Sequence, residues 1–286
     1  MNAFKKFLIA LPLALGLSVA QAAAGGYPLD HFPTGKLTEQ AALQNGAKLF
    51  VNFCLNCHGA SSMRYNRLMD IGLSEEQIKK NLLFSADKVG EPMKISMDPV
   101  DAKVWFGAQP PDLSVIARAR ASGAGSGADW LYTYLRAYYR DASRPIGWNN
   151  AVFPSVGMPH VLWEMQGSRG ATIEDIKAVK DEGGATTGFQ KIVVSFDTDG
   201  NRTEVKEKVD GHPHEGTTVT LGKAEGGSLS AARYDEEVAD LVAYITFMSD
   251  PSAQARTRMG VWVLLFLAFF TVLAWWMNKE YWKDIK

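Results

Sequence analysis

The motif Cys54-Leu55-Asn56-Cys57-His58 constrains this chain most, because it contains both of the chain's cysteines. Two thiols separated by two residues can each add to one vinyl group of a haem, and the histidine that follows supplies an axial iron ligand. A zinc site would need a second such pair, and a thioredoxin-like dithiol would not need the histidine. The motif therefore predicts one covalently attached haem c, bound through Cys54 and Cys57, with His58 as a metal ligand.

The first residues have the pattern of a secretory signal peptide. Lys5 and Lys6 precede a short apolar run over residues 7–19, and Ala20-Gln21-Ala22 has the small residues of a cleavage site. The apolar run is short for a membrane span. We therefore expect a signal peptide over residues 1–22 and export of the body that follows, which agrees with haem attachment outside the cytoplasm.

A second apolar segment lies near the C-terminus. The run from Met259 to Met277 contains no charged residue, and at about 1.5 Å per residue it covers roughly 28 Å, close to the hydrocarbon thickness of a bilayer. Aromatic residues follow at its far end, where they favour the headgroup layer. The pattern predicts a transmembrane anchor over residues 256–278 and a cytoplasmic tail over residues 279–286.

The remaining residues, 23–255, have the length of one domain, which we expect on the periplasmic side of a bacterial inner (plasma) membrane. The formal net charge of the chain is −1. That balance argues against a nucleic-acid partner, because binding to phosphate backbones needs a strongly basic surface.

Four segments of the domain have helical patterns. Residues 37–53 place Gly46 and Phe50 on one face, with Thr38 as the expected N-cap, and residues 234–248 carry an apolar stripe behind an acidic start. Helical patterns are also present over residues 74–84 and over the aromatic-rich residues 129–139, some of whose rings we expect beside the haem.

Over residues 183–227 the helical patterns give way to strand patterns. Residues 191–196 and 203–209 read as two strands joined by a turn at residues 197–201, and residues 217–221 as a short third strand. The expected fold class is therefore mainly α, a helical domain around one covalent haem, with an inserted β-hairpin and a single C-terminal transmembrane helix.

The second axial position of the iron decides between electron transfer and ligand chemistry. Met158 lies in Gly157-Met158-Pro159, where glycine and proline favour a rigid loop that can hold a thioether in place. A thioether favours ferrous iron and raises the reduction potential. The residue chemistry alone leaves Met158 open against the rivals His160, Met165, Met93 and Met97.

Several motifs in a fixed order carry a family resemblance. After the haem motif come Gly107-Ala-Gln-Pro-Pro-Asp-Leu-Ser114, Arg118-Ala-Arg120, Gly157-Met158-Pro159 and Arg258-Met-Gly260, the last of which opens the anchor. With these motifs the chain resembles the bacterial type of cytochrome c1, the haem subunit of the quinol–cytochrome c reductase (cytochrome bc1) complex. The haem motif alone would indicate only a c-type protein.

The resemblance implies roles for the matched positions. It makes Met158 the second metal ligand, opposite His58, and places Pro110 and Pro111 on the His58 side, where a backbone carbonyl orients the imidazole. It implies that Arg120 pairs with a haem propionate. It also implies a helix crossing of the class I cytochrome c type, between the Gly46/Phe50 face and the Leu241/Tyr244 face.

The implied function is one-electron transfer from the Rieske iron–sulfur protein to a cytochrome c acceptor, beside cytochrome b in a dimeric complex. The subunit would not be an enzyme on its own. One alternative is a tail-anchored c-type cytochrome that delivers electrons to a terminal oxidase or another respiratory partner. Another is a sensor or catalytic protein with an open iron position, which would require that Met158 is not a ligand.

Overall fold

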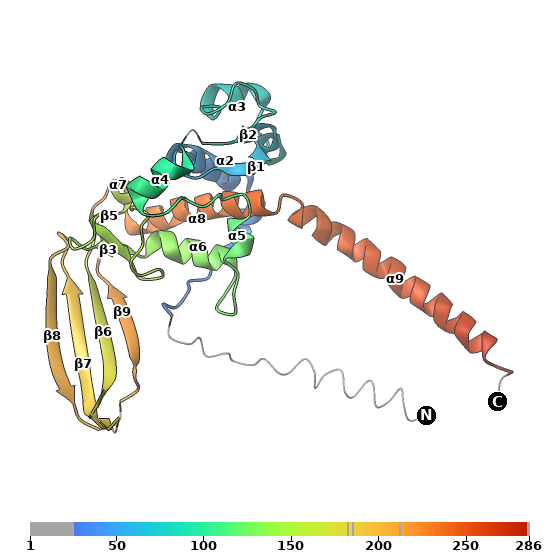
Figure 1. Cartoon of the computed structure of the whole chain (residues 1–286). Coiled ribbons are helices and arrows are strands. Elements are labelled where there is room, and N and C mark those ends of the chain that lie inside the picture. The colour runs from blue at the N-terminus through green and yellow to red at the C-terminus, as the bar shows by residue number, and fades with distance from the viewer. Residues whose placement is uncertain (1–25, 96, 182, 185, 212, 285–286) are drawn as a thin grey trace.

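The computed structural model describes residues 26–284, except residues 96, 182, 185 and 212. The expected signal peptide lies outside the described residues. A helical domain forms the centre of the molecule, a four-stranded sheet projects from one end of it, and a long helix leaves from the other end (Figure 1).

The helices α2 (Gln40–Leu49) and α8 (Ala231–Ser249) cross at the centre of the helical domain. A Cβ atom at Gly46 would lie 2.0 Å from the backbone oxygen of Asp240 and 2.7 Å from the Cβ of Tyr244, so only glycine allows this approach. The rings of Phe50 and Tyr244, both fully buried, pack with centroids 5.5 Å apart. The expected crossing of these two helix faces is confirmed.

The start of α2 differs from the expectation. Thr38 is not its N-cap: it ends the 3-10 helix η1 (Thr34–Thr38), where its hydroxyl donates to the backbone oxygen of Gly35. Glu39 takes the N-cap position of α2 without a side-chain hydrogen bond. The helix continues into η2 (Phe50–Cys54), a π-helical turn that carries the chain into the haem motif.

Two other helices are shorter than the segments predicted for them, residues 74–84 and 129–139. Helix α3 (Glu75–Asn81) is capped by Ser74 in a capping box, and α6 (Gly127–Arg136) begins one residue after its cap, Ser126. Helix α6 ends before Tyr138, because Tyr138–Arg140 (β3) pairs in antiparallel register with Trp148–Asn150 (β4).

The remaining elements of the helical domain are short and connect these helices. They are β1 (Ala60–Arg64), η3 (Tyr65–Ile71), β2 (Pro92–Met93), α4 (Pro99–Phe106), α5 (Ile116–Ala119), α7 (Trp163–Gln166), β5 (Gly167–Ser168) and β10 (Glu225–Gly226).

The projecting sheet is antiparallel, with strand order β8-β7-β6-β9. The strands β7 (Thr186–Phe196), β8 (Arg202–Val209) and β9 (Gly216–Leu221) correspond to the three predicted strands. The sequence patterns missed β6 (Ala171–Lys180), which pairs with β7 on one side and β9 on the other. The expected hairpin is therefore part of a four-stranded sheet that begins before residue 183.

Helix α9 (Ala253–Tyr281) leaves the domain as a single helix with no buried residues (Figure 1). It is long and apolar enough to cross a membrane, as its sequence indicates. It is the one such helix among the described residues, which supports single-pass anchoring.

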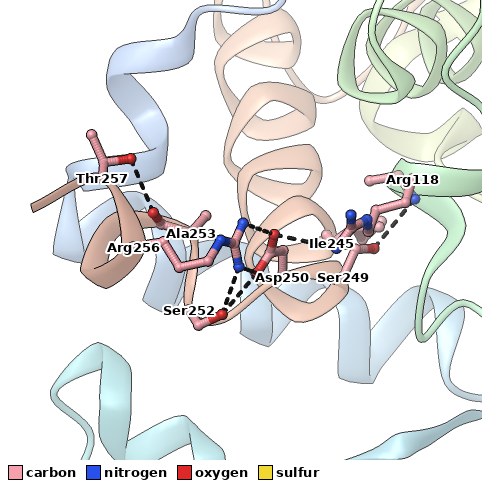
Figure 2. A network of polar contacts seen from close by, with 9 residues as sticks. Arg118, Ile245, Ser249, Asp250, Ser252, Ala253, Arg256 and Thr257 are labelled. Atoms are coloured by element: carbon pink, nitrogen blue, oxygen red, sulfur yellow. Dashed lines mark hydrogen bonds and ion pairs between the residues drawn. The ribbon is translucent and has the colours of Figure 1, made fainter. Parts of the chain in front are cut away.

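The joint between α8 and α9 is held by Asp250, as Figure 2 shows. Its carboxylate accepts hydrogen bonds from both terminal nitrogens of Arg256, from Nη1 at 2.6 Å, and lies 3.4 Å from Nη1 of Arg118. The Arg256 hydrogen bonds lower the pKa of Asp250 to about 2, so the carboxylate is charged at neutral pH. Gln254 adds a second connection, because its Nε2 donates to the backbone oxygen of Leu37 at 2.6 Å.

Candidate haem site

The haem motif occupies the turn that follows η2. The backbone N–H groups of Cys57 and His58 both donate to the carbonyl of Cys54, at 3.1 and 2.8 Å. This tight turn buries Cys54 and His58 and leaves Cys57 partly exposed. Burial raises the pKa of the Cys54 thiol to about 12, with the neighbouring Cys57 as a second cause.

The imidazole of His58 is oriented by a residue far away in the sequence. Its Nδ1 lies 2.7 Å from the backbone oxygen of Pro111. A carbonyl oxygen can only accept, so Nδ1 must carry the proton, and Nε2 is left with a lone pair for a metal. Burial lowers the pKa of His58, against the opposing effect of the Pro111 hydrogen bond. These contacts suit a neutral imidazole ligand.

The segment that supplies this carbonyl is itself held in place. The Asp112 carboxylate accepts hydrogen bonds from the backbone N–H groups of Ser61 and Ser114, both at 2.8 Å. Burial would raise the pKa of Asp112, but the hydrogen bonds from Ser114 and Ser61 outweigh it and the pKa is lowered. Leu113 N–H donates to the carbonyl of Gly59 at 2.8 Å. The Pro110-Pro111 segment is thereby attached to the strand that follows the haem motif.

A cavity of about 330 Å³ brings the predicted site residues together. Its lining is mainly apolar and comes from the haem motif, the loop after α4, helix α6 and the loop around Met158. All seven residues predicted from the sequence line it: Cys54, Cys57, His58, Pro110, Pro111, Arg120 and Met158. Two thiols, an imidazole and a thioether in one apolar cavity form a donor set that fits a covalently attached haem.

One wall of the cavity is aromatic. The Trp130 and Tyr134 rings stack with centroids 4.7 Å apart at an interplanar angle of 12°. The guanidinium carbon of Arg120 lies 4.4 Å from the centroid of Trp130, a cation–π contact that fixes the charge at the cavity edge. The expectation that aromatic residues of 129–139 lie beside the site is confirmed for these two rings.

Two tyrosine hydroxyls hold Met158. Tyr134 donates to the Met158 Sδ at 3.4 Å, and the single proton of the Tyr138 hydroxyl is shared between the Tyr134 oxygen at 2.7 Å and the Met158 carbonyl at 3.3 Å. Sequence reasoning did not find these contacts. The spacing of the two tyrosines on a predicted helix was visible, but which loop they would meet was not.

Met158 is the one residue of the five weighed as second ligand that lines the cavity. His160 is buried elsewhere, stacked on Tyr138 with ring centroids 4.7 Å apart at an angle of 5°, and burial lowers its pKa to about 3. Met93 is fully buried beside the hydroxyl of Tyr244. Met97 and Met165 do not line the cavity. This arrangement favours Met158 as the ligand.

Other lining residues were not predicted from the sequence. Phe53, Phe106 and Phe153 approach the cavity from three different segments, and Val156 and Val161 flank the Met158 loop. No motif distinguishes these residues, because apolar side chains of the same kind are present throughout the chain.

Replacing Tyr134 by phenylalanine should lower the midpoint potential of the haem-loaded protein by on the order of tens of millivolts. The hydroxyl withdraws electron density from the Met158 sulfur, and a weaker donor favours ferrous iron. Potentiometric titration of the purified protein measures the shift. Tyr132→Phe is the matched control, because Tyr132 lies on the same helix and does not line the cavity; equal shifts in both variants would contradict the assignment.

Comparisons with a family model and with individual known proteins agree with each other. A family model described as "Cytochrome C1 family" matches residues 31–168 and 227–285, more than half of the chain. The unmatched residues between these ranges contain the four-stranded sheet.

Relatives of three organisms illustrate matches over nearly the whole chain. The "Ammonia monooxygenase gamma subunit" of Nitrosomonas europaea is 39% identical, over 98% of this chain and 98% of its own. The "Cytochrome c1" of Allochromatium vinosum is 37% identical, over 98% of this chain and 99% of its own. The "Cytochrome c1" of Rhodospirillum rubrum is 27% identical, over 99% and 98%.

Proposed function

The chain belongs to the cytochrome c1 family, and we propose that it takes one electron from a Rieske iron–sulfur protein and passes it to a cytochrome c. Members of this family carry one covalently attached haem c and are membrane-anchored electron-transfer subunits of the cytochrome bc1 complex. The observation that carries the proposal is the single cavity in which the haem motif and Met158 meet.

The site residues attach and orient the cofactor. When bound, haem c supplies one-electron chemistry at its iron. Cys54 and Cys57 would carry the two thioether bonds, and His58 and Met158 would be the iron ligands. The Pro111 carbonyl accepts a hydrogen bond from the Nδ1–H of His58 and so keeps the lone pair on Nε2. With both of these residues as ligands, the haem would have no open iron position for a substrate, which suits electron transfer.

The other lining residues control charge and water. Arg120 is placed to neutralise a haem propionate, and its contact with Trp130 limits its rotamers. Pro110 and the aromatic wall of Trp130 and Tyr134 exclude water. A water-poor cavity with a thioether donor favours the reduced state and therefore a high potential.

The proposed membrane topology rests on helix α9 and on the pattern over residues 1–22. We place the haem domain on the periplasmic side of a bacterial inner membrane, because the pattern over residues 1–22 indicates export and α9 follows the domain. Within a dimeric complex, cytochrome b would then lie beside α9, and the Rieske protein and cytochrome c would approach the haem domain.

A second candidate comes from the names of the relatives. The protein from Nitrosomonas europaea is called a subunit of ammonia monooxygenase, so a chain of this family could belong to a different complex. The tail-anchored cytochrome that serves a terminal oxidase is the remaining alternative. The cavity does not distinguish these alternatives, because it contains the residues that would hold the haem and not the surfaces that would meet a partner. The partner proteins distinguish them.

Purification of the tagged full chain in mild detergent tests the proposal. We expect a di-haem cytochrome b and an iron–sulfur protein to co-purify, together with antimycin-sensitive reduction of cytochrome c by quinol. Co-purification with monooxygenase or oxidase subunits, without reductase activity, would assign the chain to one of the other complexes. The tagged Cys57→Ala variant is the control, because it should lose one thioether bond and most of the activity.

A further inference from the structure

We propose that a cavity at the junction of the domain and its anchor binds the phosphodiester headgroup of an anionic membrane phospholipid. This cavity is separate from the haem site. It measures about 760 Å³, within the range of about 300–1,000 Å³ that is typical of small-molecule sites. Its walls come from η1, α2, η3, α5 and the α8–α9 joint.

The cavity has an apolar part that suits hydrocarbon. Leu37, Leu43, Met69, Ile71 and Phe247 line it. Of these, Leu43 and Ile71 belong to the buried core, so the cavity extends inward from the surface. Such a lining can hold the glycerol end of a lipid and the start of an acyl chain.

The polar part of the cavity has an excess of positive charge. Arg118 and Arg258 line it, and Arg256 lies beside it on Asp250. Among the described residues, Asp250 is the one carboxylate that pairs with these arginines, through Arg118 and Arg256. The other acidic lining residue, Asp70, pairs with Arg67 at 2.7 Å. Three guanidinium groups against one carboxylate leave a site that attracts an anion.

Donor groups remain available for that anion. Arg258 has no ion-pair partner among the described residues, and the Arg118 side chain is 67% exposed, with only one nitrogen facing Asp250. Thr246 is also among the residues that line the cavity, and its hydroxyl is buried without a hydrogen-bond partner in the described part of the chain. An unpaired buried hydroxyl is costly, which indicates a missing partner.

The position of the cavity at the start of α9 indicates which anion it binds. The uncharged run of α9 begins at Met259, directly after Arg258, so the joint lies at the headgroup level of the bilayer. In membrane proteins, lysine and arginine are usually in excess on the cytoplasmic side. Arginines on the translocated side oppose this bias, so their presence here needs another explanation. Lipid phosphate is the anion found at this depth. The inference depends on the membrane anchor and not on which complex the chain joins.

The test uses the haem-loaded full chain in mild detergent, titrated with phosphatidylglycerol and followed by native mass spectrometry. We expect the double variant Arg118→Gln/Arg258→Gln to weaken the tightest binding about tenfold or more, because each lost hydrogen bond to a charged group contributes strongly. The control Arg202→Gln/Arg233→Gln removes two exposed arginines elsewhere and should bind as the original does. An unchanged haem absorption spectrum shows that each variant is folded.

Four outcomes would overturn the proposal. Equal lipid binding by the Arg118/Arg258 variant and the original chain would place the lipid elsewhere. Equal competition by inorganic phosphate would indicate a site for free anions, and equal binding of phosphatidylcholine would show that the cavity does not select for negative charge. A photoactivatable phosphatidylglycerol should form crosslinks within residues 37–43 or 246–258, and crosslinks confined to the far end of α9 would also contradict the assignment.

Discussion

Replacing Met158 by leucine should lower the midpoint potential by on the order of a few hundred millivolts, a large part of the roughly 0.8 V that axial ligands span. Leucine keeps the size of the side chain but removes the thioether that favours ferrous iron. The two thioether bonds to Cys54 and Cys57 remain, so the variant should still contain covalent haem. Potentiometric titration measures the potential, and carbon monoxide should now bind the reduced protein.

Met165→Leu is the matched control for this experiment. Met165 lies in α7, close to Met158 in the sequence, and does not line the cavity. Its replacement should leave the potential within tens of millivolts of the original, since no ligand is lost. If Met158→Leu behaved like this control, the second ligand would have to come from another residue, and the open-iron alternative would return to consideration.

Replacing Gly46 by alanine should reduce the free energy of unfolding of the haem domain by about 3 kcal/mol, the upper end of the usual cost of overpacking. The added Cβ would lie 2.0 Å from the backbone oxygen of Asp240. A backbone atom in a buried helix cannot move aside, so α2 and α8 would have to separate and disturb the packing of Phe50 against Tyr244. Denaturant unfolding of the full chain in detergent, followed by the circular dichroism of the haem, measures this loss.

The direction of the stability change distinguishes a close helix crossing from a helix without one. Alanine is favoured over glycine inside a helix by about 1 kcal/mol, so without the crossing the substitution would stabilise α2. Gly90→Ala is the control, because a Cβ at Gly90 would have no atom within 4 Å. A stable Gly46→Ala variant would mean that the two helices do not approach as closely as described.

The sheet and helix α6 show where sequence patterns are insufficient. Strand β6 mixes charged and apolar residues without a clean alternation, and its extended form comes from hydrogen bonding to β7 and β9 on either side. The aromatic residues at 130, 134 and 138 suggest a longer α6, yet Tyr138 belongs to β3. In both cases pairing with a distant strand overrides the local preference.

The second ligand shows the same limit inside the site. Met158 and His160 lie two residues apart in one loop, and the residue chemistry did not separate them. In the folded chain the Met158 sulfur meets the Tyr134 hydroxyl at the cavity, whereas the His160 ring stacks on Tyr138 away from it. The course of the backbone in this loop decides which of the two side chains faces the cavity. That course depends on how the loop packs against the residues around it.

The sequence by itself determined the features that are local along the chain. Haem attachment requires only the five residues from Cys54 to His58, and membrane spanning requires only an uncharged run of sufficient length. The tertiary structure alone decided the contacts between distant segments, such as the Tyr134 hydroxyl on the Met158 sulfur and the Arg118 guanidinium beside Asp250. These contacts depend on where the packed helices bring loops together, and no spacing within one segment encodes that position.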